Sequence, residues 1–162
     1  MALIVQKFGG SSVKDAERIN NVADIVTSTY KEGNDVVVVV SAQGDTTDDL
    51  LAKAAEITHD PSGREMDMLL AAGEEISIAL LTMALQSMGT SAISLTGWQA
   101  GFRTDQSYTK ARIQRLDTER IENELNRNRV VVVAGFQGLN KMDDITTLGR
   151  GGSDTSAVAI AA

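Results

Sequence analysis

The sequence predicts a doubly wound α/β domain built around a mainly parallel β-sheet. Short runs of β-branched residues alternate along the chain with longer segments whose apolar residues recur at helical spacing. Unbroken apolar runs of this kind are typical of strands that are covered on both faces. In such a sheet the crossovers are right-handed, and ligands bind at the carboxyl ends of the strands. The 162 residues suit one domain with a substantial core.

Four short apolar segments are predicted to be strands. They lie at residues 3–5, 36–40, 92–95 and 130–134. The second of them consists of five valines. Between residues 96 and 117 the pattern is weaker, and we expect short strands or a hairpin near residues 104–105 and 111–113.

Four helices are predicted between these strands. They cover residues 13–30, 47–58, 64–88 and 118–128. In the first, apolar residues recur every three or four positions until Gly33 supplies a stop. For the longest helix we expect an apolar stripe that faces the core, made of Met66, Leu69, Leu70, Ile76, Leu80 and Met83. Residues 153–162 begin like a further capped helix and end without a cap, so we expect a fraying terminus or a longer natural chain.

The composition excludes several functional classes. Fifteen Lys and Arg residues against 22 Asp and Glu residues give a net charge of −7, which argues against non-specific nucleic-acid binding. The absence of Cys removes disulfides, thiolate nucleophiles and zinc–thiolate sites. The single histidine, His59, rules out a multi-histidine metal site, and we expect it to be a solvated loop residue rather than a triad member.

No uninterrupted apolar run approaches the roughly 18 residues of a membrane span, and the first residues do not resemble a signal peptide. We therefore expect a cytoplasmic domain without a membrane partner that acts on small anionic molecules.

Two glycine-containing turns follow predicted strands. Lys7 precedes Gly9 and Gly10 at the end of the first strand, where backbone N–H groups, a helix N-terminus and a lysine would suit a phosphate. Ser41 begins a second polar turn, which leads to Thr47. An ordinary tight turn with a serine cap would use the same residues.

A third loop is richer in glycine, and one acid stands out within a helix. Gly149, Gly151 and Gly152 flank Arg150, whose planar guanidinium suits a carboxylate or phosphate. Glu74 lies among apolar residues of the longest predicted helix, so it is expected to bind a ligand amine or hydroxyl or to cap a neighbouring helix. Its neighbour Glu75 competes for that role, and Trp98 is either a lid aromatic or an edge of the core.

Together, six segments resemble the N-terminal part of the catalytic domain of the aspartate kinases, within the amino-acid kinase family. They are VQKFGGSSV at 5–13, VSAQGDTTD at 40–48, REMDMLLAAGE at 64–74, LTGWQAG at 95–101, VVAGFQG at 132–138 and TTLGRGGSDT at 146–155. The resemblance implies a three-layer α/β/α sandwich and ATP-dependent phosphorylation of the side-chain carboxylate of L-aspartate, with magnesium bound to ATP. It implies a place in lysine, threonine and methionine biosynthesis.

The resemblance also implies roles for individual residues. The lysine at position 7 and the adjoining turn would hold the phosphates, with a serine beside the transferred group: Lys7, Phe8, Gly9, Gly10 and Ser41. Other residues would hold the amino acid: Thr47, Glu74, Arg150, Gly151, Gly152 and Ser153. Arg150 would pair with a substrate carboxylate and Glu74 with its ammonium group, while Asp154 would orient Lys7 or a neighbouring donor. No resident protein-bound metal is expected.

The length departs from the family, whose members continue into a segment that holds adenine and ribose and then into regulatory ACT domains. We therefore expect residues 1–162 to form the aspartate-binding part of the domain, inactive alone and acting in a homo-oligomer or with other kinase subunits. Two alternatives are another amino-acid kinase, acting on glutamate, acetylglutamate or a nucleotide, and a non-catalytic half-domain that binds anions or other subunits.

Overall fold

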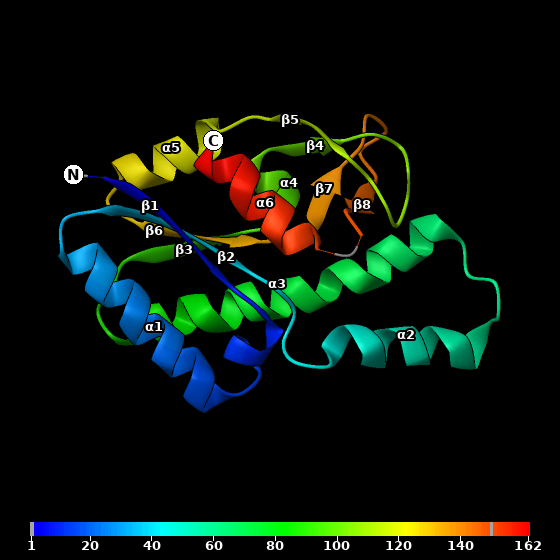
Figure 1. Ribbon diagram of the computed structural model, residues 1–162, viewed down its shortest axis with the longest axis horizontal. Coiled ribbons are helices and arrows are strands. Elements are labelled where there is room, and N and C mark those ends of the chain that lie inside the picture. Colours follow the sequence, from blue (N-terminus) through cyan, green and yellow to red (C-terminus); the bar gives the residue numbers. More distant parts are fainter. Residues whose placement is uncertain (1, 150) are drawn as a thin grey trace.

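Two four-stranded sheets form the frame of the computed structural model, which describes residues 2–149 and 151–162 (Figure 1). Sheet A is parallel and has the order β1 (Leu3–Phe8), β2 (Asp35–Val40), β6 (Val130–Ala134) and β3 (Ala92–Leu95). Sheet B has the order β5 (Ile113–Leu116), β4 (Phe102–Thr104), β7 (Gln137–Leu139) and β8 (Ile145–Thr147). The β4–β5 and β7–β8 pairs are antiparallel.

Helices and sheet B cover the two faces of sheet A. Helices α1 (Ala16–Lys31) and α3 (Gly63–Ser87) pack on one face. The other face carries sheet B with α4 (Gly97–Ala100), α5 (Glu119–Asn126) and α6 (Gly152–Ala161). Helix α2 (Thr46–Ile57) buries no residue and runs beside α3, away from sheet A (Figure 1). The predicted three-layer α/β/α class with a mainly parallel sheet is confirmed.

The valines of β2 show why this strand needs cover on both sides. Val36, Val38 and Val40 belong to the core beneath α1 and α3, whereas Val37 and Val39 belong to the core on the opposite face, which residues of α4, α5, α6 and β4 complete. Successive side chains of a strand point to opposite faces, so an unbroken apolar run fits only a doubly covered strand.

The first helix begins later than predicted. Residues Gly10–Val13 form a single 3₁₀ turn, and the α-helix begins at Ala16. Asp15 caps it, because its side chain accepts a hydrogen bond from the Arg18 N–H at 2.9 Å. The expected helix N-terminus directly after the glycine turn is therefore wrong.

The hairpin expected near residues 104–113 is confirmed by the antiparallel pairing of β4 with β5. The second sheet around this hairpin was not predicted. Strands β7 and β8 have three residues each, too few for an alternating pattern to be recognised.

Helix α3 turns a different face to the core than expected. Of the predicted stripe, Leu70 is buried, but Ile76, Leu80 and Met83 are exposed, Met83 to 61%. The buried face includes Asp67, Glu74 and Ser77 alongside Ile78 and other apolar residues. By length and composition alone this 25-residue helix could cross a membrane, but half of its most apolar window is buried in the fold, as in a core helix.

Candidate active site

A cavity of about 270 Å³ lies where β1 and β2 end. Most of the residues singled out from the sequence line it, namely Lys7, Gly10, Ser41, Thr47, Glu74, Gly151, Gly152, Ser153 and Asp154. They come from four distant stretches of the chain, which the parallel order of sheet A and the packing of α3 and α6 bring together. Ala42, Gly44, Phe136 and Gly149 complete the lining.

Lys7 supplies a positive charge at the cavity. It lies near the end of β1, and its Nζ is 3.0 Å from Oδ1 of Asp154 in the first turn of α6. The lysine side chain is about one third exposed and the aspartate is 71% exposed. A pair this open to water contributes little to stability, and it places the ammonium group beside the first turn of α6.

The first two polar turns are locked together by backbone contacts. Gly44 N–H donates to the Gly10 carbonyl at 2.9 Å. A Cβ at Gly10 would lie 2.7 Å from the Ala42 carbonyl oxygen, so glycine is required by the neighbouring turn. At Gly9 the nearest atom to such a Cβ would be Lys7 Nζ at 3.7 Å, so this side of the turn faces the lysine.

Helix α6 directs its N-terminus at the cavity. Gly151 is its N-cap with φ of 77°, and no side chain caps the first turn. Unpaired backbone N–H groups and the helix dipole make such an end attractive to an anion. This helix end takes the place that we had expected for the first helix of the chain. Arg150 lies outside the described residues, so its expected contact stays a prediction.

Ser41 and Ser153 join the second and third loops, because Ser41 Oγ donates a hydrogen bond to Ser153 Oγ at 2.8 Å. A Cβ at Gly135 would lie 2.8 Å from Ser153 Oγ, which shows how closely α6 approaches the end of β6. The two hydroxyl groups therefore have fixed positions at the edge of the cavity.

Phe136 and Ser156 support the third loop, and sequence reasoning missed both. Phe136 has a φ of 75°, an uncommon conformation for an aromatic residue. Its N–H donates to Ser156 Oγ at 3.0 Å, and Ser156 Oγ donates to the Gly152 carbonyl at 3.0 Å. A Cβ at Gly152 would lie 2.8 Å from the Phe136 ring. No local sequence pattern predicts that a phenylalanine adopts the left-handed backbone conformation.

Glu74 is the buried acid of the cavity. It is 4% exposed, and its Oε2 has no hydrogen-bond partner among the described residues. Burial raises the pKa of Glu74 to about 7, although backbone amides of Glu74 and Ala42 partly favour the charged form and nearby Glu75 opposes it. Glu75 is half-buried and does not line the cavity, so the geometry favours Glu74 of the two. An unpartnered carboxylate oxygen in a cavity suits a cationic ligand group.

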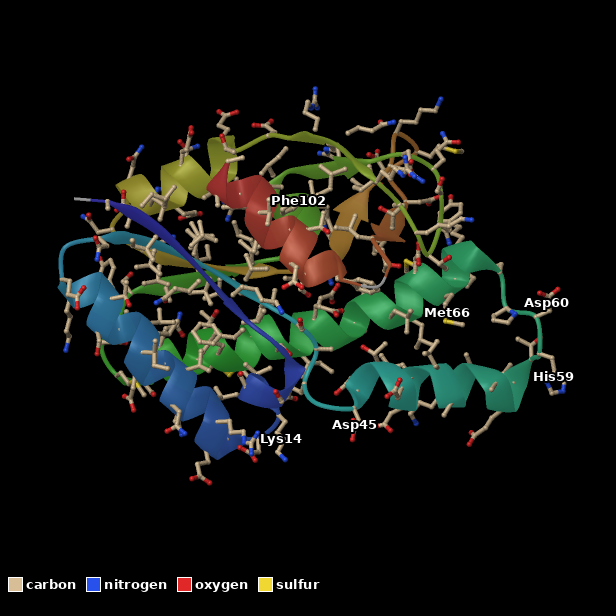
Figure 2. The ribbon with its side chains drawn as sticks, in the orientation of Figure 1. Lys14, Asp45, His59, Asp60, Met66 and Phe102 are labelled. Carbon is tan, nitrogen blue, oxygen red and sulfur yellow. The ribbon has the colours of Figure 1, made fainter. Side chains whose placement is uncertain are left out.

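The remaining candidates are placed as follows. Thr47 lines the cavity from the first turn of α2. Phe8 does not, because it packs against the core beneath α1. His59 is exposed at the turn after α2, at the end of that helix remote from the cavity (Figure 2), which confirms a solvated loop residue. Trp98 borders a separate hollow near α5.

Glycine-rich loops, a lysine and a helix N-terminus surround one cavity at the carboxyl ends of parallel strands, which is the arrangement in which α/β proteins commonly hold small anionic ligands. The comparison with known families is more specific. The amino acid kinase family matches residues 2–162, and the chain belongs to this family.

Relatives and solved structures agree with this assignment. The aspartokinase of Bacillus sp. (strain MGA3) is 59% identical over 162 residues, which cover 100% of this chain and 39% of the relative. The aspartate kinase structure from Synechocystis has a TM-score of 0.85 at 52% identity and covers 99% of this chain and 26% of that one. E. coli aspartokinase III in complex with lysine and aspartate has a TM-score of 0.83 at 25% identity, over 98% and 46%. The chain therefore spans about two fifths of the length of the curated relatives it matches.

Proposed function

We propose that these residues form the aspartate-binding part of an aspartate kinase, which transfers the γ-phosphoryl group of ATP to the side-chain carboxylate of L-aspartate. The observation that carries the proposal is the buried, unpartnered Oε2 of Glu74 in the same cavity as Lys7 and the N-terminus of α6. A cavity with a carboxylate for an ammonium group, and a lysine and a helix N-terminus for anions, suits an amino acid that reacts with a phosphate group. Relatives at 54–59% identity named aspartokinase support it.

The chemistry requires positioning more than proton transfer. A carboxylate nucleophile is already ionised at neutral pH, so no general base is needed. Phosphoryl transfer then depends on alignment and on stabilising the charge of the transferred group. In our proposal Lys7 with the Gly9–Gly10 turn holds the phosphates, Asp154 orients the Lys7 ammonium group, and Ser41 lies beside the transferred group.

We propose that the amino acid binds at the α3 and α6 side of the cavity. Glu74 would accept the ammonium group, and Thr47, Gly151, Gly152 and Ser153 would surround the rest of the substrate. Arg150 would pair with a substrate carboxylate. Within the described part of the chain no group of three His, Cys, Asp or Glu residues is placed to hold a metal. In this proposal magnesium arrives with ATP, and phosphates and water hold most of its coordination positions.

We further propose that adenine and ribose contacts, and regulatory ACT domains, belong to the part of the relatives that these residues do not match. On this proposal residues 1–162 bind aspartate but do not turn it over alone, and in the cell they act in the cytoplasm within a homo-oligomer or beside other kinase subunits. The product, 4-phospho-L-aspartate, would enter lysine, threonine and methionine biosynthesis.

The test is an acyl-phosphate assay on the natural protein at its full length. Hydroxylamine traps an acyl phosphate as a hydroxamate when L-aspartate, L-glutamate or N-acetyl-L-glutamate is the acceptor, and ADP release reports turnover when a nucleoside monophosphate is the acceptor. We expect turnover with L-aspartate, a loss of at least about a hundredfold in Lys7→Ala, and no change in Lys53→Ala on α2. Faster turnover of another acceptor would assign the site to a different kinase of the family. Aspartate binding without turnover would favour a non-catalytic module.

A further inference from the structure

A second hollow, of about 440 Å³, lies on sheet B. It shares no lining residue with the candidate active site. Three of its lining residues are the cations Arg103, Arg115 and Lys141, and the described lining contains a single carboxylate, that of Asp143. In a chain of net charge −7 this is a local reversal of sign.

The two arginines face each other across neighbouring strands. Arg103 of β4 is the direct partner of Arg115 of β5, and Leu139 of β7 is the partner of Arg103 on the other side. Partners on adjacent strands point to the same face of a sheet. The next pair, Phe102 with Leu116, packs into the core, so the arginines face outward. Like charges directly opposite each other destabilise a sheet.

No acid in the described part of the protein forms an ion pair with either arginine. Other arginines are held by acids, as Arg129 and Arg120 are by Glu124. The ion pairs found within residues 2–149 and 151–162 include neither Arg103 nor Arg115. Arg103 also borders a hollow that contains acidic residues, but none of them lies within 4 Å of its guanidinium.

The remaining lining suits a ligand with an anionic and a less polar part. Gln114 is exposed, and its side-chain amide makes none of the hydrogen bonds that the described residues show, so its donors are available. Leu139 gives the hollow an apolar element beside Arg103. Lys141 also borders an adjoining hollow of about 290 Å³ that includes Gln114, so the groove extends beyond the arginine pair.

We propose that this hollow on sheet B binds a small molecule that carries a phosphate or polyphosphate group. Two guanidinium forks and an ammonium group match the several oxygens and charges of such a group, and the bound anion would relieve the repulsion between Arg103 and Arg115. A single carboxylate would leave most of this positive charge uncompensated. The volume lies within the range of known small-molecule pockets. The site is distinct from the aspartate kinase cavity and goes beyond the proposed function.

Inorganic pyrophosphate is the probe. Because pyrophosphate also suits the Lys7 cavity, calorimetric titrations use the natural protein with Lys7→Ala, to which Arg115→Gln or the control Arg127→Gln is added. Arg127 is exposed at the end of α5 and lies outside the hollow. We expect pyrophosphate to bind the Lys7→Ala protein, Arg115→Gln to weaken this binding at least about tenfold, and Arg127→Gln to leave it unchanged.

Thermal unfolding supplies a second readout that separates binding from loss of structure. Without ligand, Arg115→Gln should raise Tm, because it removes the like-charge pair, and it should reduce the rise in Tm that pyrophosphate causes. Equal pyrophosphate affinity in the Arg115→Gln and Arg127→Gln proteins, or no binding to Lys7→Ala, overturns the proposal. Citrate binding in place of pyrophosphate overturns the assignment to phosphate. None of these results depends on whether the protein phosphorylates aspartate.

Discussion

Glu74 makes the protein sensitive to pH in a way that can be measured. Burial raises its pKa from 4.5 to about 7, and this difference corresponds to about 3 kcal/mol. The folded state holds the Glu74 proton more tightly than the unfolded state does, so the unfolding free energy falls as pH rises from about 4.5 to 7. At pH 8 the ionised, buried carboxylate should therefore lower stability by up to about 3 kcal/mol.

Replacing Glu74 by Gln keeps the shape of the side chain and removes the charge. We expect Glu74→Gln to be more stable than the wild type at pH 8, by up to about 3 kcal/mol, and to have nearly the same stability as the wild type at pH 4.5, as measured by urea unfolding.

Aspartate binding should respond to pH in the opposite sense. An ammonium ligand needs the ionised carboxylate, so affinity should fall about tenfold for each pH unit below 7 in the wild type and should be weak at every pH in the variant.

The control is Glu75→Gln. Burial also raises the pKa of Glu75, but this residue is half-buried and does not line the cavity. Among the described residues the other charged groups that line the cavity are Lys7 and Asp154, which are already paired. Glu75→Gln should therefore keep the affinity for aspartate above pH 7, and its only effect on the pH dependence should be a small shift to lower pH, because the Glu75 charge raises the pKa of Glu74. Our reasoning about Glu74 is refuted if Glu74→Gln binds aspartate like the wild type, or if its stability at pH 8 is lower.

Three further variants test how the cavity is supported. Asp67 is fully buried and accepts hydrogen bonds from two backbone N–H groups and a threonine hydroxyl at 2.7–3.2 Å. In urea titrations Asp67→Asn should therefore lower the unfolding free energy by about 2–4 kcal/mol, whereas the control Asp60→Asn, at an exposed residue, should have no effect. Gly10→Ala places a methyl group 2.7 Å from a carbonyl oxygen and should cost about 1–3 kcal/mol, whereas Gly9→Ala should fold normally; equal melting temperatures would contradict this. Ser156→Ala removes two hydrogen bonds at the base of the third loop, so calorimetry should show weaker aspartate binding with about 1–2 kcal/mol less stability.

Much of the cavity could be predicted because parallel strands end at one edge. The turns after β1 and β2 carry Lys7 and Ser41, and the parallel pairing of these strands places both at the same end of sheet A. The third loop required more than local pattern, since its approach to the cavity depends on the left-handed Phe136 and on Ser156 beneath it. Those contacts join residues twenty positions apart and leave no periodic signal.

Helix α3 shows why the apolar pattern alone misidentified the core face. Apolar residues surround most of this helix, so a stripe of them can be drawn on more than one side. The side of α3 that faces the rest of the fold carries two buried acids, Asp67 and Glu74. Asp67 accepts a hydrogen bond from the Thr147 hydroxyl and so joins α3 to β8. Glu74 is the residue of α3 that lines the cavity. These two acids share the buried face of α3 with Leu70, Ile78, Leu81 and Leu85, while Ile76 and Met83 lie in solvent. In a helix that is apolar on nearly every side, an apolar stripe alone therefore does not fix the buried face, and only the tertiary contacts of Asp67 and Glu74 distinguish these two acids from exposed Glu65 on the same helix.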